Sequence, residues 1–426
     1  MYPHGNKSKH TSQAGDTPLL YGYRILLTGL VLMSIYGGLG YYAFGVFFKP
    51  IQEEFNWERG VTSAAFAMFY VVLAVSSPLI GRLTDRYGPK KTFTLGALIL
   101  SLGLTLLSLS ANLLHFYIAY GITGLGCSTI GTVPVSYTVS NRFKKRRGTA
   151  IGIVSSGMGI GGFIVPLIIG IYLIPNFGWR ITYQILALSS LLLIIVIAQI
   201  IGKATPEGIE PISPSVERLH GTRVSSQSPK ESTLNSALKT PTFWLITCAF
   251  FMFQMAQVGT TQHLVNHLTD IGFSVPVATA IFSITNLFTA IGKLMFGYVS
   301  DRLTAKHCAT IIFLLGLVAT AVLMILNTAS SSLLIGLYVL SMGLAIGGWA
   351  PITSLLISTN FGMTHYGDIF GAFSLFFYIS TGISPTFFGY IYDTTHQYYL
   401  AYAFSLLFYS GDIVFVLIYS HFRRGQ

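Results

Sequence analysis

The sequence predicts an all-α membrane protein in which twelve transmembrane helices form two bundles of six. Three observations support this fold class. Only 9% of the 426 residues are charged, whereas soluble globular chains carry about 25%. The apolar residues gather in twelve long runs. A polar segment near the middle separates six runs from the other six, and one loop motif occurs in both halves.

The twelve runs have the length of membrane-spanning helices, because about 30 Å of hydrocarbon is crossed at about 1.5 Å per residue. They cover residues 23–48, 61–80, 92–110, 114–140, 148–174, 180–202, 242–268, 277–298, 305–327, 333–359, 366–392 and 399–420. The runs lack the alternation of membrane barrel strands. Residues 1–22 are polar, without the apolar stretch of a cleavable signal peptide, so we expect the first helix to direct insertion itself.

Residues 203–241 form the polar interruption. They contain five prolines, five basic residues and four glutamates. Such a composition cannot bury a core and predicts a cytoplasmic linker. The expected organisation is a cytoplasmic tail (1–22), an N-terminal six-helix bundle (23–202), the linker (203–241), a C-terminal six-helix bundle (242–420) and a second cytoplasmic tail (421–426).

The basic residues predict the orientation. Of the 25 Lys and Arg residues, all but four share one side if the N-terminus is cytoplasmic. Lys49, Arg59 and Arg180 fall outside, and Lys293 is the one basic residue that we place within a helix. Because cytoplasmic loops are rich in Lys and Arg, we expect an integral protein of the plasma membrane with both termini cytoplasmic. Topology then explains the net charge of +11, and we expect no nucleic-acid partner.

A loop motif occurs twice in register. Residues 81–86 read GRLTDR and residues 297–302 read GYVSDR, 216 residues later and after the second helix of each half. A repeat in two parallel six-helix halves is typical of transporters. Glycine lets helices approach closely, and the aspartate can sit against the positive N-terminal end of a helix from the other half. We therefore expect conformational gating by Gly81, Asp85, Arg86, Gly297, Asp301 and Arg302, the alternative being ordinary polar loops.

Residues 81–91, GRLTDRYGPKK, resemble the signature loop of the major facilitator superfamily. Five further segments resemble its monocarboxylate and oxalate/formate branch: YYAFGVFFKPIQEEFNW (41–57), RFKKRRGTAIGIVSSGMGIGG (142–162), FGWR (177–180), QHLVNHLTDIGFS (262–274) and YGDIFGAF (366–373). The resemblance covers residues 23–420. It implies the major facilitator fold and a secondary transporter, not an enzyme, which works without a cofactor. It also implies alternating access, a small lactate- or pyruvate-like monocarboxylate substrate, a co-transported proton, and a monomeric functional unit.

Three departures narrow the resemblance. Tyr120 stands where drug exporters of the superfamily carry an arginine, and Gly161-Gly162 stand where they carry Gly-Pro. Both differences argue against multidrug/proton antiport. Oxalate/formate exchangers carry a second buried base in the eleventh helix, but the corresponding run 366–392 contains no Lys or Arg. The absence of this second base argues against a dianionic substrate.

Lys293 is the first candidate for substrate binding. A charge within a membrane helix costs about 2.5–3.5 kcal/mol on insertion scales, and in the resembled branch a cation near this place, usually Arg, pairs with the substrate carboxylate. Asn286, Thr289 and Lys293 fall on one helical stripe, which is expected to face a water-filled cavity. The alternative is that Lys293 snorkels, since it lies only about 10 Å from the cytoplasmic region around Asp301 at about 1.5 Å per residue.

Asp270 closes the seventh run and resembles the acid that couples protons in bacterial monocarboxylate carriers. An aspartate shielded from water takes up a proton near neutral pH more readily than an exposed one. The alternative is a solvated acid in an outside loop. His263 and His267 precede it at helical spacing, but no third ligand stands at a suitable spacing, so no metal is expected. The sequence assigns no role to Asp412.

Three further residues are candidates for the substrate cavity. Tyr41 belongs to an aromatic group in the first helix that lines the cavity or, as the alternative, packs between helices. Thr132 and Met158 match cavity-facing places in the resembled carriers. Two other functions stay open: proton-independent exchange of carboxylate anions, and a sensor built on a transporter fold. A membrane enzyme is not expected, because no Ser/His/Asp or metal constellation occurs.

Overall fold

The protein is helical throughout the part that the computed structural model describes, namely residues 18–143, 147–203, 232–300, 302–362 and 365–424. The helices are α1 (Pro18–Ile35), η1 (Tyr36–Tyr42), α2 (Ala43–Phe55), α3 (Arg59–Ser108), α4 (Leu113–Ile130), α5 (Thr132–Arg142), α6 (Arg147–Ile168), η2 (Ile169–Leu173), α7 (Ile174–Lys203), α8 (Leu234–Leu238), α9 (Pro241–Gln262), α10 (Leu264–Asp270), α11 (Val275–Val299), α12 (Ala305–Ile325), α13 (Ser332–Phe361), α14 (Tyr366–Thr395) and α15 (Tyr399–Arg424).

Ten continuous helical segments of the described chain are long and apolar enough to cross a membrane. Two of them, Arg59–Ser108 and Ala150–Ile201, have 50 and 52 residues, about twice what one crossing needs. Each is divided by a glycine with a positive φ angle, Gly88 at 80° and Gly178 at 72°, a conformation that side chains other than glycine rarely adopt. Each therefore makes two crossings, and the expected twelve-helix fold is confirmed.

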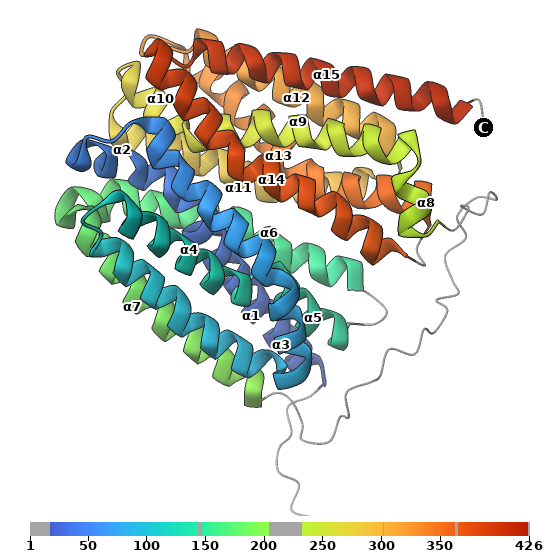
Figure 1. The fold of residues 1–426 in the computed structure, drawn as a ribbon, viewed down its shortest axis with the longest axis horizontal. Helices are drawn as coiled ribbons and strands as arrows, with labels where there is room; N and C mark the ends of the chain where they lie inside the picture. The colour runs from blue at the N-terminus through green and yellow to red at the C-terminus, as the bar shows by residue number, and fades with distance from the viewer. Residues whose placement is uncertain (1–17, 144–146, 204–231, 301, 363–364, 425–426) are drawn as a thin grey trace, which may run out of the picture.

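The helices form two six-helix halves that lie side by side (Figure 1). The N-terminal half contains α1 to α7, and the C-terminal half contains α9 to α15. We call the end where α7 ends and α8 begins the linker end, on the right of Figure 1, and the opposite end, with α2 and α10, the far end. The predicted orientation makes the linker end cytoplasmic. The predicted domain boundaries stay a prediction, and residues 204–231 lie outside the described residues.

Two helix pairs join the halves: α3 packs against α14, and α6 packs against α11. Glycine makes both approaches possible. A Cβ atom on Gly389 of α14 would lie 2.6 Å from the backbone nitrogen of Gly60, and one on Gly159 of α6 would lie 2.7 Å from that of Ala290. Any larger residue would push the halves apart at these points.

The glycines of the repeated motif differ from this pattern. A Cβ atom on Gly297 would meet nothing within 4 Å, and one on Gly81 would meet only the Val133 side chain at 3.6 Å. The expectation that these glycines allow a close helix approach is therefore wrong for this conformation. Close approach depends instead on Gly159 and Gly389, which lie directly between the halves.

The charged residues of the motif make no contact between the halves here. Asp85 is exposed and forms no hydrogen bond or ion pair with any residue that the structure describes, and Asp301 lies outside the described residues. The guanidinium carbon of Arg86 lies over the ring of the adjacent Tyr87, 5.3 Å from its centroid, and that of Arg302 lies over Tyr298 of the preceding helical turn, at 4.4 Å. Gating by these residues stays a prediction. In this conformation the expected contact of Asp85 with a helix N-terminus of the other half is not formed among the described residues.

Candidate functional site between the two halves

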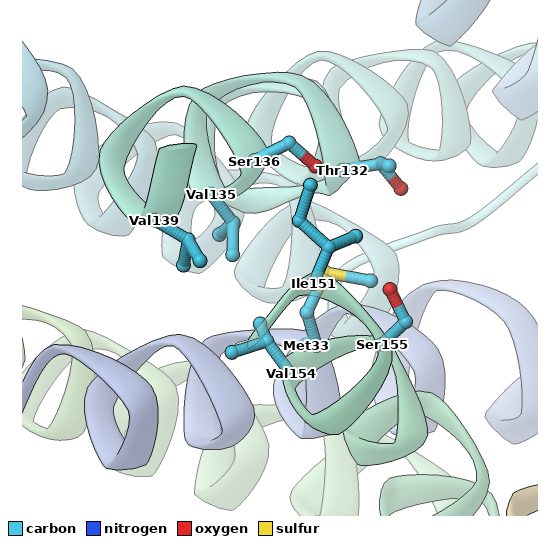
Figure 2. Close-up of a pocket in the computed structure, with 8 residues that line it drawn as sticks. All are labelled: Met33, Thr132, Val135, Ser136, Val139, Ile151, Val154 and Ser155. Atoms are coloured by element: carbon cyan, nitrogen blue, oxygen red, sulfur yellow. The ribbon is translucent and has the colours of Figure 1, made fainter. Parts of the chain in front are cut away.

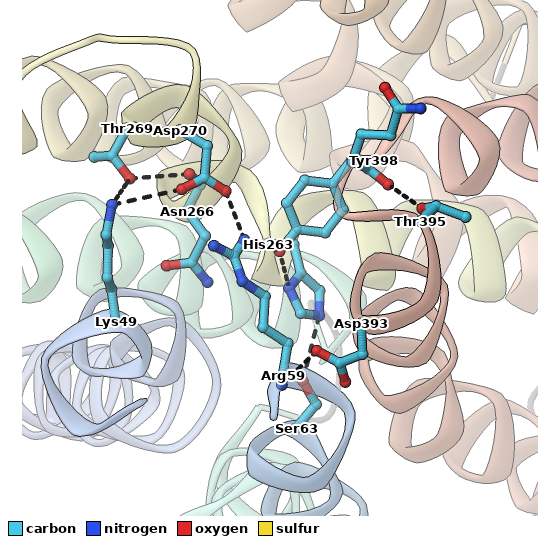
Figure 3. A network of polar contacts seen from close by, with 11 residues as sticks. Lys49, Arg59, Ser63, His263, Asn266, Thr269, Asp270, Asp393, Thr395 and Tyr398 are labelled. Carbon is cyan, nitrogen blue, oxygen red and sulfur yellow. Dashed lines mark hydrogen bonds and ion pairs between the residues drawn. The ribbon is translucent and has the colours of Figure 1, made fainter. Parts of the chain in front are cut away.

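A cluster of charges joins the two halves at the far end (Figure 3). Arg59, the first residue of α3, donates a hydrogen bond from Nη1 to Asp270 Oδ2 at 2.7 Å. Lys49 of α2 reaches the same carboxylate at 3.5 Å and Thr269 Oγ1 at 3.1 Å. The Arg59 side chain is 7% exposed and that of Asp270 is 23% exposed. Both cations come from the N-terminal half and the carboxylate from the C-terminal half, so these ion pairs hold the far end closed.

Asp393 of α14 makes a second contact between the halves. Its two carboxylate oxygens accept hydrogen bonds from the backbone nitrogens of Arg59 at 2.8 Å and Gly60 at 2.6 Å. The first backbone N–H groups of a helix have no partner within it and form the positive end of its dipole. A carboxylate of the C-terminal half therefore satisfies the start of α3, directly beside the close approach of Gly389.

A chain of hydrogen bonds continues from Arg59 into the C-terminal half. Arg59 Nη1 lies 2.6 Å from Tyr398 Oη, and Tyr398 Oη lies 2.9 Å from His263 Nδ1. Tyr398 lies between α14 and α15. Burial raises the pKa of its hydroxyl, so the hydroxyl keeps its proton and donates a hydrogen bond to His263 Nδ1. The other ring nitrogen of His263 then donates to the Pro385 carbonyl at 2.9 Å. The network fixes the orientation of the Arg59 guanidinium, which also stacks on Tyr392 with its carbon 3.6 Å from the ring centroid.

The far-end cluster bears on the two alternatives for Asp270, a proton-coupling acid or a solvated acid of an outside loop. Asp270 ends α10 and contacts two cations, Arg59 and Lys49, so it is not a freely solvated loop residue. Its role in proton coupling stays a prediction. The sequence predicts only that Lys49 and Arg59 lie outside, and it assigns them no role. The structure instead places Lys49 within α2 and buries Arg59 at the start of α3.

Lys293 lies in the second contact region, between α11 and α6. Its Nζ donates to the backbone oxygen of Ser155, in the other half, at 3.1 Å. Lys293 is half-buried, and its ammonium is thus held between the halves. Ser155 and Thr132 also line a small pocket formed by α1, α5 and α6, and Figure 2 shows their hydroxyls on the same side of it. Ser155 thus contacts the predicted substrate residue Lys293 and lines the same pocket as the predicted substrate residue Thr132.

Asn286 and Thr289 face the N-terminal half rather than open water. Both are buried, and Asn286 Nδ2 donates to the Gly162 carbonyl of α6 at 3.2 Å. Asn286 Oδ1 has no partner among the described residues. Thr289 Oγ1 donates to Thr285 O of its own helix at 3.3 Å. In this conformation α6 of the N-terminal half covers Asn286 and Thr289, and a water-filled cavity beside this stripe stays a prediction.

Tyr41 belongs to the π-helical segment η1 of the first helix, and Met158 lies beside this segment. Tyr41 is buried in an aromatic cluster with Phe66 and Tyr70, at ring-centroid distances of 5.8 and 6.3 Å. Its backbone oxygen accepts a hydrogen bond from Gln262 Nε2 of the other half at 3.0 Å. Met158 of α6 is half-buried. π-helical turns often mark functional sites, and this one stands where the first helix meets both α6 and the C-terminal half.

The comparisons with known proteins agree with this architecture. A family model described as Major Facilitator Superfamily matches residues 30–385. The oxalate:formate antiporter of Oxalobacter formigenes is 24% identical, with 84% of this chain and 80% of that one covered. Monocarboxylate transporter 12 of Homo sapiens is 24% identical, with 94% of this chain and 82% of that one covered.

A solved structure shares the fold. The bacterial homologue of the human lysosomal transporter Spinster superimposes with a TM-score of 0.66 at 18% sequence identity, covering 96% of this chain and 97% of that chain. The family match extends over most of the twelve-helix region, and these relatives are transporters rather than enzymes. The chain therefore belongs to the Major Facilitator Superfamily.

Proposed function

We propose that this protein moves a small monocarboxylate across the membrane together with a proton, by alternating access of one site between its two halves. The observation that carries the proposal is the Lys293 ammonium, held between α11 and α6 by a backbone carbonyl rather than by a carboxylate of the protein. Such a cation is available to an anionic ligand, because a carboxylate is a stronger partner for it than a neutral carbonyl.

The charge balance around Lys293 favours a monoanion. On α11, the segment Val275–Val299 contains no other basic residue. The helices packed against it, α6 and α13, contain none except Arg147, the first residue of α6. One carboxylate neutralises one ammonium, whereas a dianion would keep a buried negative charge without a partner, which is costly. The hydroxyls of Thr132 and Ser155, which line a pocket next to the residue whose backbone holds the ammonium, suit a 2-hydroxy or 2-oxo acid.

The far-end cluster supports a link between a proton and the opening of the site. While Asp270 is ionised, Arg59 and Lys49 hold it and the halves are joined. A proton on Asp270 removes the negative charge and leaves both cations without their partner, which favours opening of the far end. Loss of the proton favours closing. A difference in pH across the membrane would in this way bias the side to which the site opens.

The test uses purified protein in proteoliposomes loaded with or without a pH gradient. Labelled lactate or pyruvate is expected to accumulate when the outside is acidic. Asp270→Asn is expected to lose gradient-driven accumulation while still exchanging labelled for unlabelled substrate, because exchange needs no net proton movement. Full accumulation by the Asn variant would remove Asp270 from the coupling mechanism, and lack of transport of any carboxylate would refute the substrate class.

One relative favours a second candidate function. The antiporter from Oxalobacter formigenes is named for exchange of two carboxylates, so proton-independent anion exchange is the alternative for this chain. The same vesicles distinguish the two functions. An exchanger would take up labelled carboxylate only when unlabelled carboxylate is present inside, and a pH gradient would not change the final level.

A further inference from the structure

Helix α15 has a polar stripe on its buried face. Tyr402, Ser405, Tyr409 and Asp412 follow one another at helical spacing of three or four residues, and each is 0% exposed. Val416 continues the stripe one turn further towards the linker end. A carboxyl group is thus placed near the middle of a membrane helix and points into the protein, away from lipid.

The surroundings of Asp412 are apolar. Neighbouring Gly411 packs beside Met252 of α9, and Tyr409 packs against Phe253 of α9 at a ring-centroid distance of 5.9 Å. Phe253 in turn contacts Phe313 of α12 at 5.6 Å. Neither carboxyl oxygen of Asp412 has a hydrogen-bond partner among the described residues. Nothing in this region stabilises a negative charge.

The helices packed against α15 bring no cation to Asp412. On α12 the charged or titratable residues stand in the first turn, near the linker end. Among these, Lys306 lines an apolar pocket together with Val416, and it makes no ion pair with any described residue. The remaining titratable groups on these helices whose side chains the structure describes are Cys248 of α9, His307 and Cys308 of α12, Asp368, Tyr378, Tyr390, Tyr392 and Asp393 of α14, and Tyr399, Tyr402 and Tyr409 of α15 itself.

Two aspartates of the C-terminal half are therefore in opposite situations. Asp270 is partly exposed and contacts two cations, whereas Asp412 is buried and contacts no cation among the described residues. An ionised carboxylate without a partner in an apolar interior is strongly disfavoured, and such a group stays protonated instead. We propose that Asp412 is a second proton-binding site, which holds its proton in the conformation whose far end is closed. This inference goes beyond the proposed function, because it stands whatever the transported substrate is.

Infrared spectroscopy of the purified full-length protein in lipid at neutral pH tests the proposal directly. The spectrum is expected to contain the carbonyl stretch of a protonated carboxylic acid, which shifts in D₂O. Asp412→Asn should remove this band, whereas Asp270→Asn and Asp393→Asn should leave it in place. A parent spectrum without the band, or a band that persists in the Asp412→Asn variant, would overturn the proposal.

A measurement on the unsubstituted protein covers the case in which the Asn variant does not fold. Dicyclohexylcarbodiimide is apolar and reacts with the acid form of a carboxyl group. The acid proton moves to one nitrogen of the reagent, a carboxyl oxygen bonds to its central carbon, and an acyl shift gives a stable N-acylurea. Mass spectrometry should find this adduct on Asp412 and not on Asp270 at neutral pH. No adduct on Asp412, or an adduct on Asp270 alone, would overturn the proposal.

Discussion

Replacing Asp270 with asparagine is expected to open the far end. The substitution keeps the size of the side chain and removes the charge that Arg59 and Lys49 contact. In the parent, the far end is closed by the pair at 2.7 Å and the longer contact at 3.5 Å. With the carboxylate gone, two cations of the N-terminal half face a neutral amide, so the closed state loses stability relative to the open state.

The size of the effect follows from the geometry of the pair. Two unit charges 2.7 Å apart attract by about 6 kcal/mol at an effective dielectric constant of about 20. The cost of taking both groups out of water offsets most of this attraction, and hydrogen bonds to charged groups contribute about 1.5–3 kcal/mol net. The Lys49 contact adds little, because exposed pairs contribute about 0–1 kcal/mol. About 2 kcal/mol corresponds to roughly a 30-fold increase in the open population.

A cysteine at Ser63 reports the open population. Ser63 is 0% exposed on α3 and its Oγ lies 3.3 Å from His263 Nε2, so the position is covered by the other half while the far end is closed. A membrane-impermeant maleimide should label Ser63→Cys roughly 30-fold faster in the Asp270→Asn background. Mass spectrometry of the labelled peptide separates this site from the three native cysteines.

Two control variants make the measurement specific. Asp270→Glu keeps the charge and should restore slow labelling in large part. Asp368→Asn removes a carboxylate at the linker end, 68% exposed, and should leave the labelling rate unchanged. Equal rates in the parent and the Asp270→Asn variant would refute the reasoning, because the ion pairs would then contribute nothing to closure.

Three further predictions address the site, the packing and the orientation. Lys293→Gln should weaken carboxylate binding roughly 10- to 150-fold by calorimetry, from the loss of about 1.5–3 kcal/mol, while Lys293→Arg should keep most of it; unchanged binding in the Gln variant would mean that the site lies elsewhere. Gly389→Ala should destabilise the closed far end by about 1–3 kcal/mol through overpacking and so raise the labelling rate of Ser63→Cys. In Gly371→Ala of the same helix, the added Cβ atom meets nothing within 4 Å, so the labelling rate should not change. Cysteines at the exposed residues Asn56 and Asn235 should react with impermeant reagents from opposite sides, and reaction from the same side would contradict the predicted orientation.

Much of the fold could be predicted from the sequence, because burial in lipid requires long apolar runs whose ends are visible. The predicted run 277–298 corresponds to α11 (Val275–Val299), and 305–327 to α12 (Ala305–Ile325). The sequence did not predict that the helices continue across Gly88 and Gly178, because a positive φ angle at a glycine depends on the path of the chain and leaves no pattern in composition.

The far-end cluster could be predicted only in part. Asp270 stood out through its resemblance to a known coupling acid. Arg59 did not, because its carboxylate partner is 211 residues away in the chain, and neither the charge nor the spacing of Arg59 differs from that of an ordinary loop residue. Asp393 likewise gains its role from the start of α3, 334 residues earlier. Contacts between two separately folded halves are set by how the halves meet, and local patterns do not record this.

The contacts that close the two ends of the molecule must contribute similar free energies if the proposed alternating access is correct. A two-state protein populates both conformations only when they differ by a few kcal/mol. Here the far end is joined by the Asp270 and Asp393 contacts, while Asp85 of the linker-end motif is exposed and has no partner among the residues that the structure describes. When the far end opens and these contacts are lost, bonds of comparable strength must form at the linker end. The unpaired Asp85 is suited to supply one by meeting a helix N-terminus of the other half, just as Asp393 meets the start of α3 in the conformation described here.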